Sequence, residues 1–248
     1  MSEASQPPLG KRVVAEALGT TLLLSTVVGS GIMGERLSGG SVGLALLANT
    51  LATGAGLVAL ILAFGPISGA HFNPAVTISA AWERGLPWGE VPHYVGAQIA
   101  GALGGVLAAH MMFELPAFAF SEKVRSGGAQ MFSEFIATFG LISVIWGCAR
   151  SRSAAVPFAV GAYITAAYWF TASTSFANPA VTLARATTNT FSGIRPSDAP
   201  GFIAAQLLGA FVATALFRWL VPALPVAASR VVWRNASSTE PRSAGENR

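Results

Sequence analysis

The sequence predicts an all-α membrane protein in which six transmembrane helices and two half-helices form an inverted repeat. Three observations predict this fold. Hydrophobic residues make up 52% of the chain and charged residues only 10%, whereas soluble domains carry about 25% charged residues. Apolar stretches recur along the chain, each long enough to cross a ~30 Å hydrocarbon core as a helix. Short polar motifs in the first half of the chain return, in the same order, in the second half.

The apolar stretches are the predicted membrane spans. They cover residues 13–33, 42–64, 91–113, 131–149, 154–173 and 201–221. Each is continuously apolar rather than alternating, which argues against a membrane β-barrel. The chain is therefore expected to consist of a cytoplasmic N-terminal segment 1–12, a membrane domain 13–221 with repeat one at 13–113 and repeat two at 131–221, and a disordered cytoplasmic tail 222–248.

Lysine and arginine predict the orientation. If the chain crosses the membrane six times, ten of the fifteen Lys and Arg residues fall on the side that holds both termini. The positive-inside rule then places both termini in the cytoplasm, and we expect the protein in the cell inner (plasma) membrane. The net charge of +4 comes largely from loops and tails, so it predicts topology and no nucleic-acid partner.

Three pairs of segments define the repeat. The sequence NPAVT at residues 73–77 recurs at residues 178–182. The segment around Glu16 in the first span is echoed around Glu134 in the fourth. Gln98 in the third span, with its small neighbours, is echoed by Gln206 in the sixth. Each copy contains three spans, an odd number, so the second copy must enter the membrane from the opposite side.

Both NPA motifs lie in linkers rather than in spans. They consist of Asn73, Pro74 and Ala75, and of Asn178, Pro179 and Ala180. Asparagine is a preferred helix N-cap and proline a preferred first helical residue, so each motif is expected to start a short helix. Roughly ten residues span about 15 Å, half the hydrocarbon thickness. The inversion brings the two helix starts together at the membrane midplane.

This arrangement predicts a pore for neutral molecules. Each helix N-terminus carries roughly half an elementary positive charge, so two of them facing a pore oppose the passage of cations. The side-chain amides of Asn73 and Asn178 can replace hydrogen bonds that a solute loses on leaving bulk water.

With these motifs, the sequence resembles the major intrinsic protein family, the aquaporins and aquaglyceroporins, over residues 13–221. The resemblance is carried by Glu16, by residues 68–75 (SGAHFNPA) and by the second motif. It implies an aquaporin-like right-handed bundle in the lipid bilayer. It also implies a homotetramer with one pore per subunit, which passes water and small neutral solutes without a cofactor.

The selectivity filter departs from the family pattern. Where the family usually has arginine after the second motif, this chain has Val181. Spacing assigns Thr53 and Ser175 to two other filter positions. The fourth is Tyr168 or Ala166, depending on how the linker is counted, and we favour Tyr168. Such a filter predicts a pore wide enough for glycerol-like polyols and hydroxylated metalloids as well as water; the alternative is that Val181 is a loss of function.

A filter without its usual arginine resembles a bacterial branch associated with arsenic resistance, which implies neutral arsenous acid as a substrate. Arg185 lies four residues after Val181, one turn farther along the same helix face. It is a candidate for restoring positive charge at the outer vestibule. The alternative is an arginine at a helix end that reaches the lipid headgroups.

Two acids and one histidine complete the candidate residues. Glu16 and Glu134 are expected to be structural, accepting N–H groups of the linkers before the half-helices, with a proton relay as the alternative. His71 either lines the cytoplasmic half of the pore or is a packed, hydrogen-bonded histidine. We expect no metal, because the sequence contains one cysteine, Cys148, and no Cys/His metal spacing.

No enzyme motif is present in the sequence. A secondary transporter is the main alternative of another class, because inverted repeats with broken helices also build transporters. A coupling site would need charges near the midplane, and the sequence offers only Glu16 and Glu134 there. A receptor or a structural junction protein is a weaker alternative.

Overall fold

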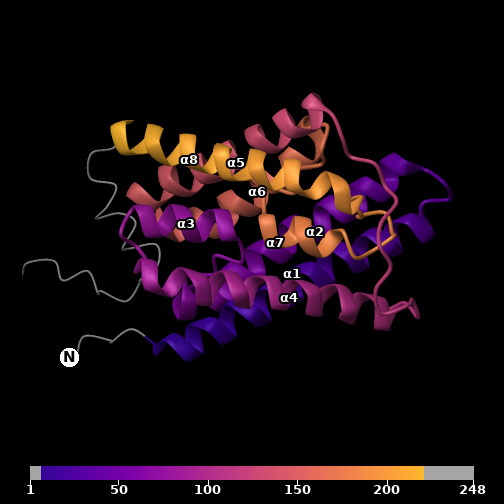
Figure 1. The fold of residues 1–248 in the computed structure, drawn as a ribbon, viewed down its shortest axis with the longest axis horizontal. Helices are drawn as coiled ribbons and strands as arrows, with labels where there is room; N and C mark the ends of the chain where they lie inside the picture. Colours follow the sequence, from indigo (N-terminus) through magenta and orange to yellow (C-terminus); the bar gives the residue numbers. More distant parts are fainter. Residues whose placement is uncertain (1–6, 221–248) are drawn as a thin grey trace, which may run out of the picture.

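The computed structural model describes residues 7–220, which form a bundle of helices with no strand in that range (Figure 1). The α-helices are α1 (Leu9–Leu37), α2 (Val42–Ser68), α3 (Pro74–Trp82), α4 (Val91–Met112), α5 (Gly128–Ser151), α6 (Val156–Phe170), α7 (Pro179–Arg185) and α8 (Ala199–Leu220). Short 3-10 turns precede three of them, at Trp88–Glu90, Ser153–Ala155 and Pro196–Asp198.

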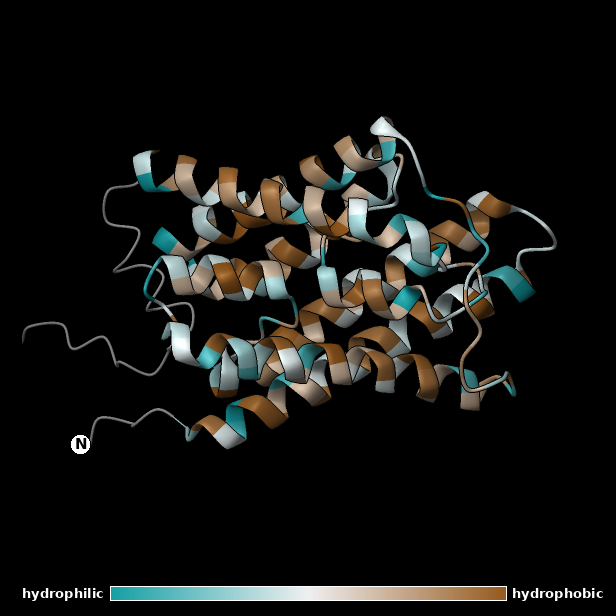
Figure 2. Ribbon diagram, in the orientation of Figure 1, coloured by the Kyte–Doolittle hydropathy of each residue, from teal (hydrophilic) through white to brown (hydrophobic). Residues whose placement is uncertain are grey.

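Six long helices cross the bundle and confirm the six predicted spans. They are α1, α2, α4, α5, α6 and α8, each long and apolar enough to span a membrane. Figure 2 shows apolar residues along their lengths and polar residues gathered toward the ends. The chain is therefore a multi-pass membrane protein. The fold agrees with the predicted class of six spanning helices and two short ones.

Helix boundaries differ from the predicted spans in places. The first helix begins at Leu9 rather than at residue 13, and α6 is shorter than the predicted stretch 154–173. Helix α2 continues past the predicted end at residue 64, through Pro66, and stops where Gly69 adopts a left-handed conformation with φ of 90°. The predicted tail 222–248 lies outside the described residues.

The two repeats pack in the same way. Helix α1 lies along α4 in the first repeat and α5 lies along α8 in the second. Both pairs approach closely at a glycine. A Cβ atom on Gly101 would clash with the carbonyl oxygen of Ala17, and one on Gly209 would clash with that of Phe135. Small residues permit such close contacts between membrane helices.

The half-helices α3 and α7 occupy the middle of the bundle and point their N-terminal ends at each other (Figure 1). They contain nine and seven residues, which at 1.5 Å per residue gives about 14 Å and 11 Å. Neither crosses a ~30 Å hydrocarbon core alone, so together they form one broken span whose break lies inside the protein.

Candidate functional site

The two NPA motifs start the half-helices as the sequence predicts. Asn73 is the N-cap of α3, and its side-chain oxygen accepts the N–H of Ala75 at 2.9 Å. Asn178 caps α7 in the same way and accepts the N–H groups of Ala180 at 3.0 Å and Val181 at 3.3 Å. The following prolines are in the first helical turn, where the missing N–H removes no helical bond.

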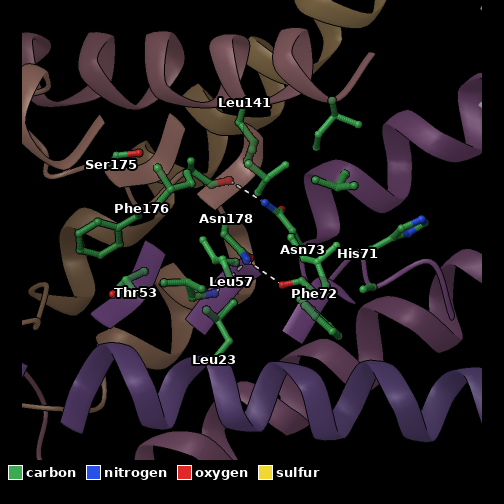
Figure 3. Close-up of a pocket in the computed structure, with 18 of the residues that line it drawn as sticks. Leu23, Thr53, Leu57, His71, Phe72, Asn73, Leu141, Ser175, Phe176 and Asn178 are labelled. Atoms are coloured by element: carbon green, nitrogen blue, oxygen red, sulfur yellow. Dashed lines mark hydrogen bonds between the residues drawn. The ribbon is translucent and has the colours of Figure 1, made fainter. Parts of the chain in front are cut away.

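Each asparagine also binds the other repeat. The amide of Asn73 donates to the carbonyl of Ala177 at 2.7 Å, and the amide of Asn178 donates to the carbonyl of Phe72, also at 2.7 Å (Figure 3). An asparagine amide carries two hydrogens, so each side chain keeps a second donor beside this reciprocal bond. The break between the half-helices is thus held by side chains from both repeats.

The linkers before the motifs have a strained backbone. Ala70 and Phe72 in the first, and Ser175 and Ala177 in the second, all have φ of 49°. A left-handed conformation costs roughly 1–2 kcal/mol for a residue with a side chain. In both linkers every second residue is left-handed, which prevents the backbone from forming a helix. The N–H and C=O groups of the linkers therefore need hydrogen-bond partners outside a helix.

Glu16 supplies those partners in the first repeat. It is fully buried on α1, and its carboxylate accepts the N–H of His71 at 2.9 Å and that of Phe72 at 2.7 Å. The hydroxyl of Ser68 donates to the same carboxylate at 2.6 Å, and the amide of Gln98 at 2.8 Å. Glu16 thereby holds the linker in place.

Glu134 does the same in the second repeat. Its carboxylate, fully buried on α5, accepts the N–H groups of Phe176 and Ala177, each at 2.8 Å. The amide of Gln206 donates to it at 2.6 Å. Neither Glu16 nor Glu134 lines the central cavity. These contacts favour the predicted structural role of both acids over a proton relay, and that role stays a prediction.

The two glutamines have a role that the sequence pattern alone does not assign. Gln98 donates to Thr77 at 2.9 Å, and Gln206 donates to Thr182 at 2.8 Å. Each threonine hydroxyl in turn donates to the carbonyl of the N-cap asparagine of its own half-helix. The internal repeat could have indicated this role, because Gln98 and Gln206 occupy matching positions in its two copies.

A cavity runs past the facing ends of the half-helices. Its wall includes both cap asparagines, His71, the four expected filter residues and Arg185. Thr53 and Ser175 lie on one side of the asparagines and His71 on the other (Figure 3). Much of the remaining wall is aliphatic, with Leu23, Leu57 and Leu141 among its residues.

The expected filter residues meet at the end of the cavity beside α7. Tyr168 is 3% exposed and its hydroxyl donates to the hydroxyl of Thr53 at 3.3 Å. Ala166 lies on the exposed face of α6, so Tyr168 is the α6 residue at the cavity. Val181 is buried and lines the same space, as does Ser175, whose buried hydroxyl has no hydrogen-bond partner in the described residues.

Arg185 turns into the protein rather than toward lipid headgroups. Its side chain is 2% exposed and lines the cavity. Its Nε donates to the carbonyl of Ser192, and its guanidinium carbon lies 3.4 Å from the centre of the Phe176 ring. The sequence pattern does not single out Phe176 or Ser192. Both lie in loops, and no local pattern indicates that they receive an arginine.

His71 combines the two roles considered for it. It lines the cavity on the α3 side of the asparagines. It is also packed, with its Nδ1 at 3.1 Å from the hydroxyl of Thr77 and its ring centre 5.4 Å from that of Tyr94.

Opposed half-helices inside a six-span inverted repeat, with a cavity between their caps, define a membrane channel. A family model described as "Major intrinsic protein" matches residues 3–168 and 149–244. The chain belongs to the major intrinsic protein family, which consists of channels and not of enzymes.

The chain is also similar to individual members of this family. The chain is 58% identical over 219 residues to "Aquaglyceroporin AqpS" of Rhizobium meliloti (strain 1021), covering 88% of this chain and 94% of that protein. It is 34% identical over 197 residues to "Aquaporin NIP2-3" of Zea mays, covering 76% of this chain and 64% of that protein. The X-ray structure of the aquaglyceroporin from Plasmodium falciparum superposes with a TM-score of 0.67 at 20% identity, covering 88% of this chain and all of that one.

Proposed function

We propose that the chain is a passive channel for water and for small uncharged solutes, glycerol-like polyols and neutral arsenous acid or other hydroxylated metalloids among them. The observation that carries this proposal is the cavity that passes between the capped ends of α3 and α7 and is lined by residues of both repeats. The 58% identity to a protein named an aquaglyceroporin supports the solute class. The four filter positions Thr53, Tyr168, Ser175 and Val181 set the upper size of the solute.

The geometry supports exclusion of cations. Two helix N-termini face the cavity, each equivalent to about half a positive charge, and the guanidinium of Arg185 adds a full charge on its wall. A neutral solute meets no such barrier, and Asn73, Asn178 and Tyr168 offer it hydrogen bonds along an otherwise largely aliphatic wall.

A coupled transporter is the less favoured interpretation. Coupling to a proton or sodium gradient needs an acidic side chain at membrane depth on the transport path. The two acids buried on spanning helices, Glu16 and Glu134, are instead engaged by linker N–H groups, and neither lines the cavity.

The assembly and location belong to the same proposal. We propose a homotetramer with one pore per subunit, in the cell inner membrane, with both termini cytoplasmic. The excess of Lys and Arg on the terminal side supports the orientation. The α7 end of the cavity, with Arg185, then faces outward. Large apolar side chains exposed on α1, α2 and α8, such as Leu18, Leu51 and Phe211, are available to lipid or to other subunits.

Stopped-flow measurements on proteoliposomes containing the full chain test the function. Water, glycerol, urea and arsenous acid are compared with empty vesicles, with and without a pH or sodium gradient. We expect each permeant solute to equilibrate with its own gradient and to ignore the ion gradients. Accumulation of a solute above its external concentration would overturn the channel proposal. Permeability no higher than that of empty vesicles would show that the protein forms no pore for these solutes.

A further inference from the structure

The guanidinium of Arg185 is a buried charge whose donors are only partly used. Its Nε binds the carbonyl of Ser192 and one face covers Phe176. Its two terminal nitrogens make no hydrogen bond to any described residue, although the side chain is only 2% exposed and lines the cavity. Buried charges are normally paired or fully hydrogen-bonded, because an unpaired one is costly. The terminal nitrogens thus present unused donors to the cavity.

No acid of the described chain neutralises this charge directly. The carboxylate that influences Arg185 is Glu134, and its oxygens accept three N–H groups of the second repeat. The described ion pairs do not include Arg185. The α7 end of the cavity is therefore short of negative charge.

Two other basic side chains add to the positive charge at this end of the cavity. Arg125, from the loop before α5, stacks on the same Phe176 ring at 5.0 Å and donates to the carbonyls of Ser173 and Gly193. Lys123 lies in the same loop. Burial, followed by the charges of Arg125 and Arg185, lowers the pKa of Lys123 to about 8, against a smaller opposing effect of Glu35. Three basic side chains thus act on one another around this end of the cavity.

Hydroxyl donors complete the arrangement. Ser175 lines the cavity, and its buried hydroxyl has no hydrogen-bond partner among the described residues. The hydroxyl of Tyr168 is bound to Thr53 at the same end. Among the described residues, no lysine or arginine lines the opposite end of the cavity. The two motifs are 105 residues apart, so the counterpart of Arg185 in the first repeat is Ala80, which also lines the cavity. The charge is therefore present in one repeat and missing at the matching position of the other.

We propose that the α7 end of the cavity is a binding site for a small monovalent inorganic anion such as chloride, held by the terminal nitrogens of Arg185 and the hydroxyl of Ser175. The bound anion occupies the space through which solutes enter and so lowers their flux. It does not pass through, because the wall beyond is largely aliphatic and the amides of Asn73 and Asn178 alone do not replace its full hydration shell. This inference rests on the proposed channel function.

The test uses full-length protein in proteoliposomes. Glycerol permeability is measured while gluconate, which is too large for the site, is replaced by chloride at constant ionic strength and osmolarity. We expect permeability to fall by about twofold when the chloride concentration equals its dissociation constant, and further as chloride saturates the site, because the bound anion excludes the solute. Arg185→Gln should abolish the chloride effect. Arg36→Gln, which removes a charge from the exposed end of α1, should preserve it.

Ser175→Ala is the second variant, since it removes one hydroxyl with little effect on packing. It should raise the half-inhibitory chloride concentration about tenfold, the loss expected for one hydrogen bond to a charged group. Broadening of the chloride NMR line by the purified protein measures binding independently of flux. Glycerol flux that ignores chloride, with no broadening above that of Arg185→Gln or Ser175→Ala, would overturn the site. Absence of glycerol flux in wild type would instead overturn the channel proposal.

Discussion

The hydroxyl of Tyr168 on α6 donates a hydrogen bond to the hydroxyl of Thr53 on α2, 3.3 Å away, at the end of the cavity beside α7. The two residues are 115 positions apart in the chain and come from different repeats. Their bond fixes the tyrosine ring at the cavity wall. With Val181 and Ser175 it defines the ring of side chains that we propose as the filter.

Val181→Arg should make this filter more selective for water. An arginine side chain would occupy the ring and present rigid donors that suit a small solute. We expect glycerol permeability to fall more than water permeability when both are measured on the same proteoliposomes. Val181→Leu is the matched control, because it adds volume without charge or donors. An unchanged glycerol-to-water ratio in Val181→Arg would place the filter elsewhere.

Arg185→Ala should increase the leak of cations and change the solute size limit little. The side chain contributes charge to the wall, while the ring itself is formed by the four residues named above. Sodium flux and a series of polyols of increasing size, measured on one preparation, separate the two effects. A shift in the size limit without any cation leak would mean that Arg185 acts as a steric element.

Asn73→Leu and Asn178→Leu should each block or sharply reduce flux. Leucine removes the donor at the narrow centre, the helix cap and the bond to the opposite linker. Loss of an N-cap alone costs about 1 kcal/mol. Assembly is checked by size-exclusion chromatography, so that a folded but closed channel is recognised. Full flux in both variants would show that solutes do not pass between the motifs.

Glu16→Gln should lower the thermal unfolding midpoint of the purified protein and reduce flux. A neutral amide cannot accept all four donors that reach this carboxylate, and hydrogen bonds to charged groups contribute about 1.5–3 kcal/mol each. Glu35→Gln, at the exposed end of the same helix, is the control and should leave both quantities unchanged. Equal midpoints for the two variants would contradict the structural role.

Gly101→Ala should destabilise the bundle, whereas Gly96→Ala on the same helix should not. The new Cβ at position 101 would clash with the backbone of Ala17, while at position 96 it would have nothing within 4 Å. Overpacking of this kind costs about 1–3 kcal/mol. Thermal unfolding in detergent compares the two variants. A loss of thermal stability in Gly96→Ala but not in Gly101→Ala would contradict the close contact between α1 and α4.

Spans and half-helix starts could be predicted because their causes are local. Apolar length determines the spans, and Asn followed by Pro determines where α3 and α7 begin. The end of α2 could not be predicted in the same way. Pro66 is a helix breaker by propensity, yet it lies inside α2, and the helix stops only at the left-handed Gly69.

Much of the site depends on contacts between distant segments. Spacing indicates that Thr53, Ser175 and Val181 reach the cavity, but it leaves Tyr168 and Ala166 as alternatives, because only the rotation of α6 distinguishes them. The direction of Arg185 depends on the carbonyl of Ser192 and the ring of Phe176. Both belong to irregular loops, whose shape is set by tertiary packing rather than by a sequence period.

The bonds between Asn73 and Ala177 and between Asn178 and Phe72 are the same bond made twice, with the repeats exchanged. A contact of this kind is isologous, the form found at the two-fold axis of a homodimer. Two separate half-chains inserted in opposite directions would satisfy it without any covalent link between them. The contact between the two half-helices therefore has the symmetry of a subunit interface, although it lies within one chain. That symmetry is broken toward the α7 end of the cavity, where Arg185 occupies the position that Ala80 holds in the first repeat.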